Sequence, residues 1–439
     1  MPEYVVLMLA TTLVCYVAGL AIEKSNRHFL RKLLLTFCIG SNLLILLAFK
    51  YLGFFVESIE WIASTFDVAM DLPMRRFLVP VGISFYTLQS IGYVIDIYLR
   101  KIQSEKHLGL FALYIAFFPK LAAGPIERTQ HLLPQFRQVK TFDCDLVYSG
   151  LRIMLWGAFK KIVVADRIAI MVNTVYNAPE SFGRWAITLA TFLFAIQIYC
   201  DFSGYTDIAI GSAKILGYDL IANFRFPYFA STFRDFWRRW HISLSTWFRD
   251  YVYIPLGGNR VTKHRWLCNI LIVFAISGLW HGTNWTFVIW GILHAVYLIC
   301  EAILHPFITN VLPSVSTWKH RSILRPLRVL YVFVFVSIGW IFFRARSIRK
   351  VGIIMTRLLS NEYGVKEILN LGLPPIELLF SCYGIIVLLV VDVMIFLRPC
   401  FIMRLWQRRI VRWTSYVIAI YSIVFFGAFN GLDFIYFQF

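Results

Sequence analysis

Hydrophobic residues in this chain gather in long uncharged runs, and within these runs apolar and polar positions do not alternate. A helix needs about 20 apolar residues to cross the hydrocarbon core of a bilayer. Backbone amides inside that core must be satisfied without water, so runs that lack the period-two pattern of barrel strands are predicted to be helices. Such runs lie at Tyr4–Ile22, Leu33–Phe49, Phe77–Ile95, Trp185–Cys200, twice within Trp266–Cys300, Val329–Phe343, Leu378–Val391 and Trp413–Leu432.

Two further apolar stretches are interrupted or flanked by charge. Leu108–Pro119 is followed by Lys120, and Leu151–Ile170 contains Arg152, Lys160 and Lys161. Such segments suit re-entrant or tilted helices that line a cavity. Together the runs predict an all-α polytopic membrane protein with about nine to eleven transmembrane helices. No linker or repeat divides residues 1–439, which we expect to form one membrane domain with a short soluble insertion near Ser360–Pro375.

Composition and charge support a bilayer as the solvent. Hydrophobic residues make up 59% of the chain and charged residues 15%, against about 25% charged in soluble domains. The net charge is +19, and its placement predicts orientation. By the positive-inside rule we expect the basic clusters to be cytoplasmic, the acidic or near-neutral loops Val56–Asp71 and Asn173–Phe182 not to be, and the N-terminus to lie outside. The clusters are Lys24–Lys32, Arg100–Lys106, Arg225–Arg265, Lys319–Arg328 and Arg398–Arg412.

The simplest interpretation of these clusters is that they only fix orientation and contact the anionic head groups of the lipid bilayer. None carries a nucleic-acid recognition module, so we expect no nucleic-acid partner. Eight cysteines are scattered without a Cys-x-x-Cys pair. We interpret them as small buried hydrophobes rather than disulfides or metal ligands.

His281 is the first candidate for chemistry. It lies within 35 residues that hold no Lys, Arg, Asp or Glu, between Gly278 and Gly282. Two glycines so close weaken or break a helix, which places the imidazole at a discontinuity. A neutral imidazole is suited to removing a proton from a hydroxyl during acyl transfer. The alternative is a core histidine bonded to a neighbouring helix.

A second constellation spans residues 231–255. Arg234, Arg238, Arg239 and Arg249 interleave there with aromatic residues around His241. The pattern is typical of an amphipathic helix at the membrane interface, and ion pairs on such a helix are the alternative to a binding role.

Two carboxylates, Asp201 and Asp207, close the run that begins at Trp185. Six helical residues turn through about 240°, so the two do not share a face and are expected to bond to basic groups or backbone of neighbouring helices. His294 follows His281 by 13 residues, which is not the spacing of a zinc helix, and no His-Glu-x-x-His occurs. We therefore predict no metal site.

Four motifs in order resemble the membrane-bound O-acyltransferase family, in particular its bacterial branch that O-acetylates alginate and peptidoglycan. They are FFPKLAAGPIER (Phe117–Arg128), YCDFSGYTDIAIG (Tyr199–Gly211), RDFWRRWHISLSTWFRDYVYIPLGGNR (Arg234–Arg260) and GLWHGTNWTFVIWGILH (Gly278–His294). The likeness extends from about Val79 to the terminal FIYFQF at Phe434–Phe439.

The resemblance implies a helical bundle around a central funnel or tunnel in a bacterial cell (inner, plasma) membrane. It matches His281 to the family's catalytic histidine and His241 to its second motif histidine. An acyl group, most simply acetyl, would pass from a cytoplasmic thioester donor, acetyl-CoA or an acyl carrier, to an envelope polysaccharide, with no bound cofactor. Arg234, Arg238, Arg239 and Arg249 are predicted to hold the donor, and Trp280, Asn284 and Asp201 to support the site. An extracytoplasmic transferase that uses a serine is the partner expected.

Two other classes of protein compete with this interpretation. A transporter or flippase would use Asp96, Asp201 and Asp207 as coupling groups, but it leaves the histidine motifs unexplained. A scaffold for envelope synthesis would make the motif residues dispensable.

Overall fold

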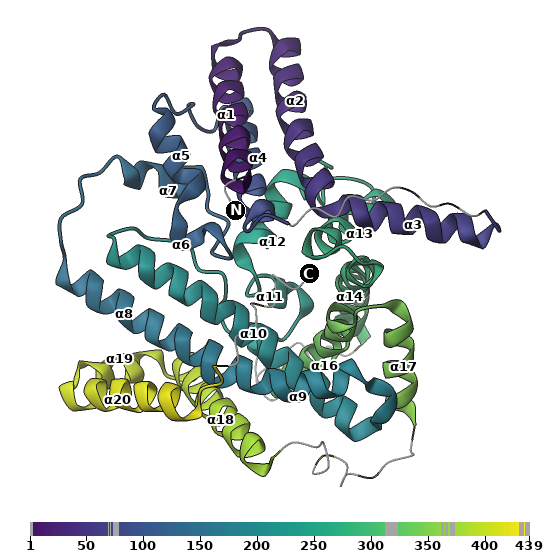
Figure 1. The fold of residues 1–439 in the computed structure, drawn as a ribbon, viewed down its shortest axis with the longest axis vertical. Coiled ribbons are helices and arrows are strands. Elements are labelled where there is room, and N and C mark those ends of the chain that lie inside the picture. Colours follow the sequence, from purple (N-terminus) through teal and green to yellow (C-terminus); the bar gives the residue numbers. More distant parts are fainter. Residues whose placement is uncertain are drawn as a thin grey trace.

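Every regular element in the described part of the chain is a helix. The computed structural model describes residues 3–68, 70, 72, 79–311, 324–360, 364, 368, 374–429 and 434. Most of the predicted insertion at Ser360–Pro375, part of the basic cluster Lys319–Arg328, most of the terminal motif and the start of the run at Phe77 lie outside these residues. The helices shown in Figure 1 are Glu3–Lys24 (α1), His28–Leu46 (α2), Leu47–Tyr51 (η1), Leu52–Thr65 (α3), Ile83–Tyr98 (α4), Leu108–Ala116 (α5), Phe118–Leu121 (α6), Thr129–Phe136 (α7), Cys144–Ala158 (α8), Phe159–Ala165 (η2), Asp166–Asn177 (α9), Pro179–Ser181 (η3), Arg184–Ile215 (α10), Pro227–Phe229 (η4), Phe233–Trp237 (α11), Ile242–Phe248 (α12), Arg249–Tyr253 (η5), Lys263–His281 (α13), Trp285–Val311 (α14), Arg325–Arg344 (α16), Ile348–Leu359 (α17), Pro375–Leu397 (α18), Pro399–Gln407 (α19) and Arg409–Phe426 (α20).

Seven stretches of the described chain are long and apolar enough to cross a membrane. They confirm the all-α polytopic fold, whereas the count of nine to eleven spans stays a prediction. The run expected at Phe77–Ile95 appears as α4, with 16 residues, nearly all of them buried. A helix this short and this enclosed in protein packs against α1 and α2 rather than facing lipid on its own.

Helix α10 lies at the centre of the bundle. In its most apolar window 78% of residues are buried, against 6% in α20, which faces outward. Helix α8 runs against α10 at glycine contacts: a Cβ on Gly150 would lie 2.5 Å from the Gly211 carbonyl oxygen, and one on Gly157 would lie 2.5 Å from that of Gly204. The seven-residue spacing of glycines on both helices therefore sets their close approach.

The interrupted stretch Leu151–Ile170 is a continuous helix with a π-helical segment, η2, at its centre. Lys160 in η2 binds Asp207 of α10 at 2.7 Å, and Lys161 binds Asp201 at 2.7 Å. The prediction that these two carboxylates bond to basic groups of a neighbouring helix is confirmed. Buried charges persist when they are paired in this way.

The segment 231–255 is not the single amphipathic surface helix that its pattern predicted. It breaks into α11, α12 and η5, and Phe236, Trp240 and His241 are completely buried. The aromatic residues make up much of the core around α10, so burying them on several faces outweighs the continuity of one helix.

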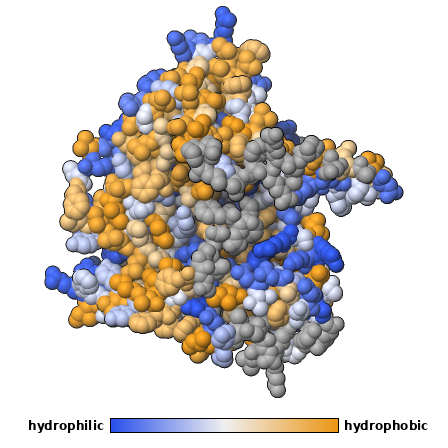
Figure 2. All heavy atoms as spheres, in the orientation of Figure 1, coloured by the Kyte–Doolittle hydropathy of each residue, from blue (hydrophilic) through white to orange (hydrophobic). Residues whose placement is uncertain are grey.

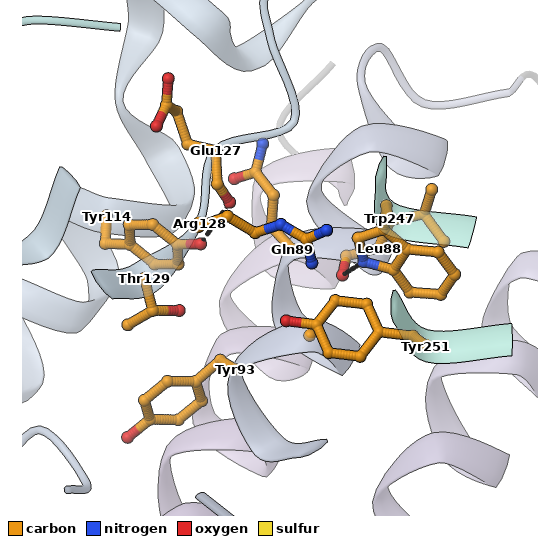
Figure 3. Close-up of a pocket in the computed structure, with 10 residues that line it drawn as sticks. Leu88, Gln89, Tyr93, Tyr114, Glu127, Arg128, Thr129, Trp247 and Tyr251 are labelled. Carbon is orange, nitrogen blue, oxygen red and sulfur yellow. Dashed lines mark hydrogen bonds between the residues drawn. The ribbon is translucent and has the colours of Figure 1, made fainter. Parts of the chain in front are cut away.

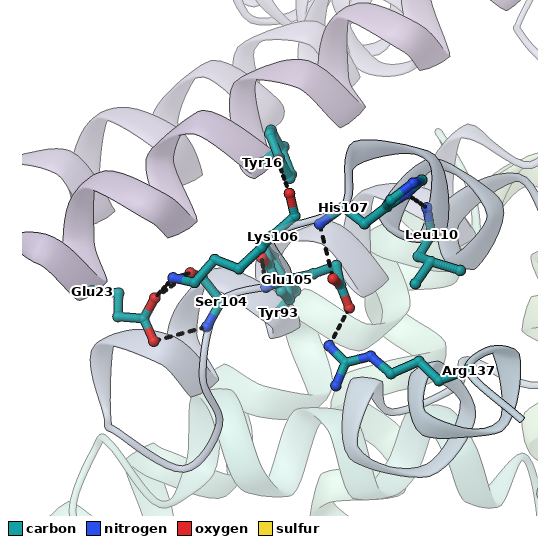
Figure 4. A network of polar contacts seen from close by, with 9 residues as sticks. All are labelled: Tyr16, Glu23, Tyr93, Ser104, Glu105, Lys106, His107, Leu110 and Arg137. Atoms are coloured by element: carbon teal, nitrogen blue, oxygen red, sulfur yellow. Dashed lines mark hydrogen bonds and ion pairs between the residues drawn. The ribbon is translucent and has the colours of Figure 1, made fainter.

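The polar loop between α4 and α5 contacts both α1 and the end of α7 through hydrogen bonds and ion pairs (Figure 4). Glu23 of α1 accepts hydrogen bonds from Ser104 and Lys106, and the Tyr16 hydroxyl donates to the Lys106 carbonyl at 2.6 Å. Glu105, 3% exposed, accepts from the His107 amide at 2.9 Å and from Arg137 at 2.5 Å. The loop after α4 thus fixes the N-terminal helices to the rest of the fold.

The face seen in Figure 2 is largely hydrophobic, and its hydrophilic residues lie at the connection between α1 and α2 at the top and in patches at the right-hand side. Exposed residues of α20 include Ile410, Trp413 and Phe425. The cysteines follow the same division, which corrects the expectation that all are buried: Cys144, Cys268, Cys300, Cys382 and Cys400 are exposed, and only Cys15, Cys38 and Cys200 are buried. A thiol on an apolar outer face meets lipid rather than core.

Candidate active site

His281 ends helix α13 at a sharp hairpin. Gly282 is extended, with φ −164° and ψ 161°, and α14 begins at Trp285. A Cβ on Gly278 would lie 2.2 Å from the Phe287 carbonyl oxygen, so the two helices approach closely here. The predicted helix discontinuity at His281 is confirmed, and it presents the imidazole inside the bundle at 3% exposure.

His241 precedes α12 and has a left-handed backbone, with φ 42° and ψ 55°. A non-glycine residue in this conformation is strained, and such strain is commonly found at functional sites. Asn223 holds it: the Asn223 carbonyl accepts from the Ile242 amide at 2.9 Å, and its Oδ1 lies 2.6 Å from the Ser243 hydroxyl and 3.4 Å from His241 Nδ1. Since Asn223 Oδ1 can only accept, His241 Nδ1 carries the proton in this arrangement and Nε2 carries the lone pair.

The two motif histidines meet although 40 residues separate them. Their ring centroids lie 6.2 Å apart, and both side chains are buried. Trp280 packs edge-on to His281 at 5.0 Å, and Trp290 and Phe343 lie at 5.0 and 5.5 Å. The pair therefore occupies an aromatic enclosure built from α12, α13, α14 and α16.

Several donors of this enclosure have no hydrogen-bond partner among the described residues. They are the indole N–H groups of Trp240, Trp280, Trp290 and Trp340. The buried His241 Nε2 also has no hydrogen-bond partner among the described residues. A buried donor that forms no hydrogen bond costs about 1–3 kcal/mol of stability. Several such donors in one enclosure therefore favour binding of a ligand that carries oxygen acceptors.

Lys50 is a site residue that the sequence reasoning missed. It lies in η1, one residue beyond the predicted run Leu33–Phe49, and its ammonium donates to the Trp280 carbonyl at 2.8 Å. The signal available was the lysine itself, because an ionisable residue in a long apolar stretch marks a functional site by default. Asn223 stands in no motif, and Ser243 lies within the motif Arg234–Arg260 but is not distinguished there from the other polar residues.

The remaining predicted residues are spread around this centre. Asn284 caps α14, with Oδ1 accepting from the Thr286 amide, and its Nδ2 donates to the Arg346 carbonyl at 3.1 Å. Asp201 pairs with Lys161, and its neighbour Phe202 packs on His241 at 4.7 Å.

Among the predicted donor-binding arginines, Arg234, Arg238 and Arg249 are exposed. Arg239 and Arg249 are held in ion pairs with Asp235 and Asp250, both at 2.8 Å. In the described part of the chain, Arg234 and Arg238 are therefore the members of this cluster that are exposed and form no ion pair.

Comparison with known proteins decides the family. The family model described as "MBOAT, membrane-bound O-acyltransferase family" matches residues 101–343, which include both histidines. The chain belongs to the membrane-bound O-acyltransferase family. The resemblance read from the motifs is thereby confirmed, as is the class of enzyme, an acyltransferase.

Three relatives show which branch of the O-acyltransferase family is similar. The probable alginate O-acetylase AlgI of Azotobacter vinelandii is 37% identical over 79% of this chain and 67% of its own length. The probable alginate O-acetylase AlgI of Pseudomonas aeruginosa is 38% identical over 70% of this chain and 56% of its own length. The peptidoglycan O-acetyltransferase of Helicobacter pylori is 33% identical over 79% of this chain and 68% of its own length. The match thus spans between about half and two thirds of these relatives.

Proposed function

We propose that this protein is a membrane O-acetyltransferase that takes an acetyl group from a cytoplasmic thioester and delivers it across the membrane for O-acetylation of a cell-envelope polysaccharide. The observation that carries the proposal is the meeting of His241 and His281, buried at 6.2 Å in an enclosure with unused hydrogen-bond donors. The names of the similar proteins, alginate O-acetylase and peptidoglycan O-acetyltransferase, support acetyl as the group and polysaccharide as the class of acceptor.

In the proposed reaction His281 acts as general base. Its imidazole removes the proton of the acceptor hydroxyl, whose oxygen attacks the thioester carbonyl carbon. The carbon–sulfur bond then breaks, and the leaving thiolate takes the proton back from the imidazolium. The Trp280 indole N–H is a donor suited to the developing oxyanion, whereas the Asn284 amide is engaged at a helix cap.

His241 is proposed to position the donor thioester beside His281. The cytoplasmic clusters Arg234, Arg238, Arg239 and Arg249 would hold the donor's anionic parts, and no bound cofactor is required. The acceptor is the polysaccharide itself or the serine of an extracytoplasmic transferase. The protein would work in the bacterial inner membrane.

Replacement of His281 tests the mechanism. His281→Ala should lower acetyl transfer by about 10²–10⁴-fold, the contribution usual for a general base. His264 lies exposed on the same helix, so His264→Ala is a matched control and should retain activity. Near-normal polymer acetylation by His281→Ala protein that is folded would contradict the mechanism and favour a scaffold.

Proteoliposomes separate the enzyme from a transporter. Acetyl-CoA labelled in the acetyl group is enclosed, and acceptor polymer is supplied outside. Label on the outer polymer with coenzyme A retained inside supports transfer. Intact donor found outside, with unmodified polymer, would show a transporter. The carboxylates that a transporter would use for coupling are already paired here: Asp201 and Asp207 with lysines, and Asp96 with Tyr251 at 2.9 Å.

A further inference from the structure

The motif Phe117–Arg128 has no role in the proposed chemistry, and its last four residues lie outside any helix. Arg128 is extended, with φ −88° and ψ 140°. Successive side chains of an extended chain point to opposite sides. Figure 3 shows the result: the Glu127 carboxylate points away from the Arg128 side chain, which extends toward Trp247. Neighbouring residues at this end of the motif therefore contact different parts of the fold.

Glu127 is a buried carboxylate that binds the stretch after α10. It is 1% exposed, its Oε1 accepts from the Ile221 amide at 2.6 Å, and its Oε2 lies 2.8 Å from His131 Nδ1. Ile221 belongs to residues 218–224, which form no helix, so amides shielded from water there need acceptors from other elements. A carboxylate forms a charge-assisted bond with such an amide, about twice as strong as a neutral one. Glu127 therefore fixes this stretch.

The same stretch carries Asn223, two residues beyond the amide that Glu127 binds. Asn223 Oδ1 lies 2.6 Å from the Ser243 hydroxyl and 3.4 Å from His241 Nδ1. The Ser243 hydroxyl in turn accepts from the Ile126 amide at 3.0 Å. Ile126 and Glu127 are adjacent in the chain, so the motif holds both sides of the contact between Asn223 and His241.

Arg128 connects the motif to the element that follows α12. Its Nη2 donates to Asp250 of η5 at 2.9 Å, and its guanidinium carbon lies 4.5 Å from the centre of the Tyr251 ring. Residues 126–128 thus bind the start of α12, the stretch that carries Asn223 and the element after α12. Three consecutive residues enclose the segment on which His241 lies.

We propose that Glu127 is a positioning residue for His241, acting through Ile221 and Asn223. The inference rests on the proposed function for the reaction that His241 serves. Since Asn223 orients the imidazole through Nδ1, a shift of the stretch that carries Asn223 turns the ring. Misplacing a reacting group by about 1 Å costs about 100-fold in rate. The motif 117–128 therefore acts on the reaction without contacting the reacting atoms.

Two variants of similar size test the hydrogen bond to Ile221. Glu127→Gln keeps an oxygen that accepts from the amide, whereas Glu127→Met has none. Glu127→Met should lower the acetyl-transfer rate about tenfold, as expected for loss of one hydrogen bond to a charged group, and Glu127→Gln should stay within about threefold of the unsubstituted protein. Equal rates of the Met and Gln variants would overturn the proposal.

Glu105→Met is a matched control for removal of a buried carboxylate. Glu105 is 3% exposed and also accepts from a backbone amide, but in the loop after α4. Below its melting temperature this variant should keep the rate within about twofold. A tenfold loss in this control would mean that any buried carboxylate has the same effect, and would overturn a specific role for Glu127.

Combination with Asn223→Ala separates positioning from general destabilisation. If Glu127 acts through Asn223, Glu127→Met should lower the rate less than about twofold once residue 223 is alanine, because coupled effects are not additive. A full tenfold loss in both backgrounds would mean that the two residues act independently, and would overturn the proposal. Should Glu127→Met melt below the assay temperature, Glu127→Asp replaces it, since a side chain one methylene shorter withdraws the acceptor while keeping the charge.

Hydrogen exchange of the full-length protein, read by mass spectrometry, needs no turnover. In Glu127→Met, peptides that cover residues 218–224 and 241–244 should exchange faster than in Glu127→Gln, because the bonds of the Ile221 and Ile242 amides open more often. Unchanged exchange in these peptides would overturn the proposal. If the unsubstituted protein transfers no acetyl group, the proposed function fails, and exchange alone then decides whether Glu127 fixes the segment of His241.

Discussion

At the scale of single residues, Asn223 is the side chain on which the geometry of His241 depends. Its Oδ1 accepts from Ser243 and faces His241 Nδ1, next to a strained backbone. Asn223→Ala should lower the acetyl-transfer rate about 100-fold, the cost of misplacing a reacting group by about 1 Å. Asn223→Asp keeps the acceptor oxygen and should restore part of the rate, with a pH profile shifted because a carboxylate favours protonated His241. Equal rates in the two variants, with an unchanged profile, would show that Asn223 does not position His241.

At the scale of elements, the contact between α8 and α10 depends on glycines that admit the opposite backbone. Gly204→Leu would place a Cβ 2.7 Å from the Gly157 carbonyl oxygen. We expect a loss of about 1–3 kcal/mol in the free energy of unfolding, the usual cost of overpacking. Gly40→Leu in α2 is the control, since no atom lies within 4 Å of its Cβ position. Thermal melting in detergent measures both, and equal melting temperatures would contradict this account of the helix pair.

At the scale of the whole molecule, the loop after α4 ties the N-terminal helices to α7 through Glu105. Burial raises the pKa of Glu105, but hydrogen bonds from the His107 amide and Arg137 outweigh it and leave the pKa below its usual value. A carboxyl with a lowered folded pKa stabilises above its unfolded pKa, about 4.3, and loses that contribution as pH falls through the folded value. The unsubstituted protein should therefore melt at a higher temperature than the Glu105→Gln variant at neutral pH. The two melting temperatures should converge in acid. A constant difference across this range would exclude Glu105 as the titrating group.

The amino-acid pattern alone predicts the membrane as solvent, the helical class, the family and the helix break at His281. Long uncharged runs permit only satisfied backbones in lipid, and two glycines around a histidine mark a broken helix. The prediction from the local pattern was wrong at residues 231–255, where interleaved arginines and aromatic residues indicate a single surface helix. Burial of Phe236 and Trp240 against distant helices overrode that preference.

The side chains around the two histidines come from distant parts of the chain, and helix packing brings them together. Asn223, whose Oδ1 faces His241 Nδ1, lies 18 residues before that histidine. Lys50, which binds the carbonyl of Trp280 next to His281, lies 231 residues before His281. Contacts over such separations follow from how helices pack, and helix packing depends on close approaches such as those of Gly157 and Gly278. A single chain read locally shows which residues are polar in an apolar run, but not which of them share a pocket.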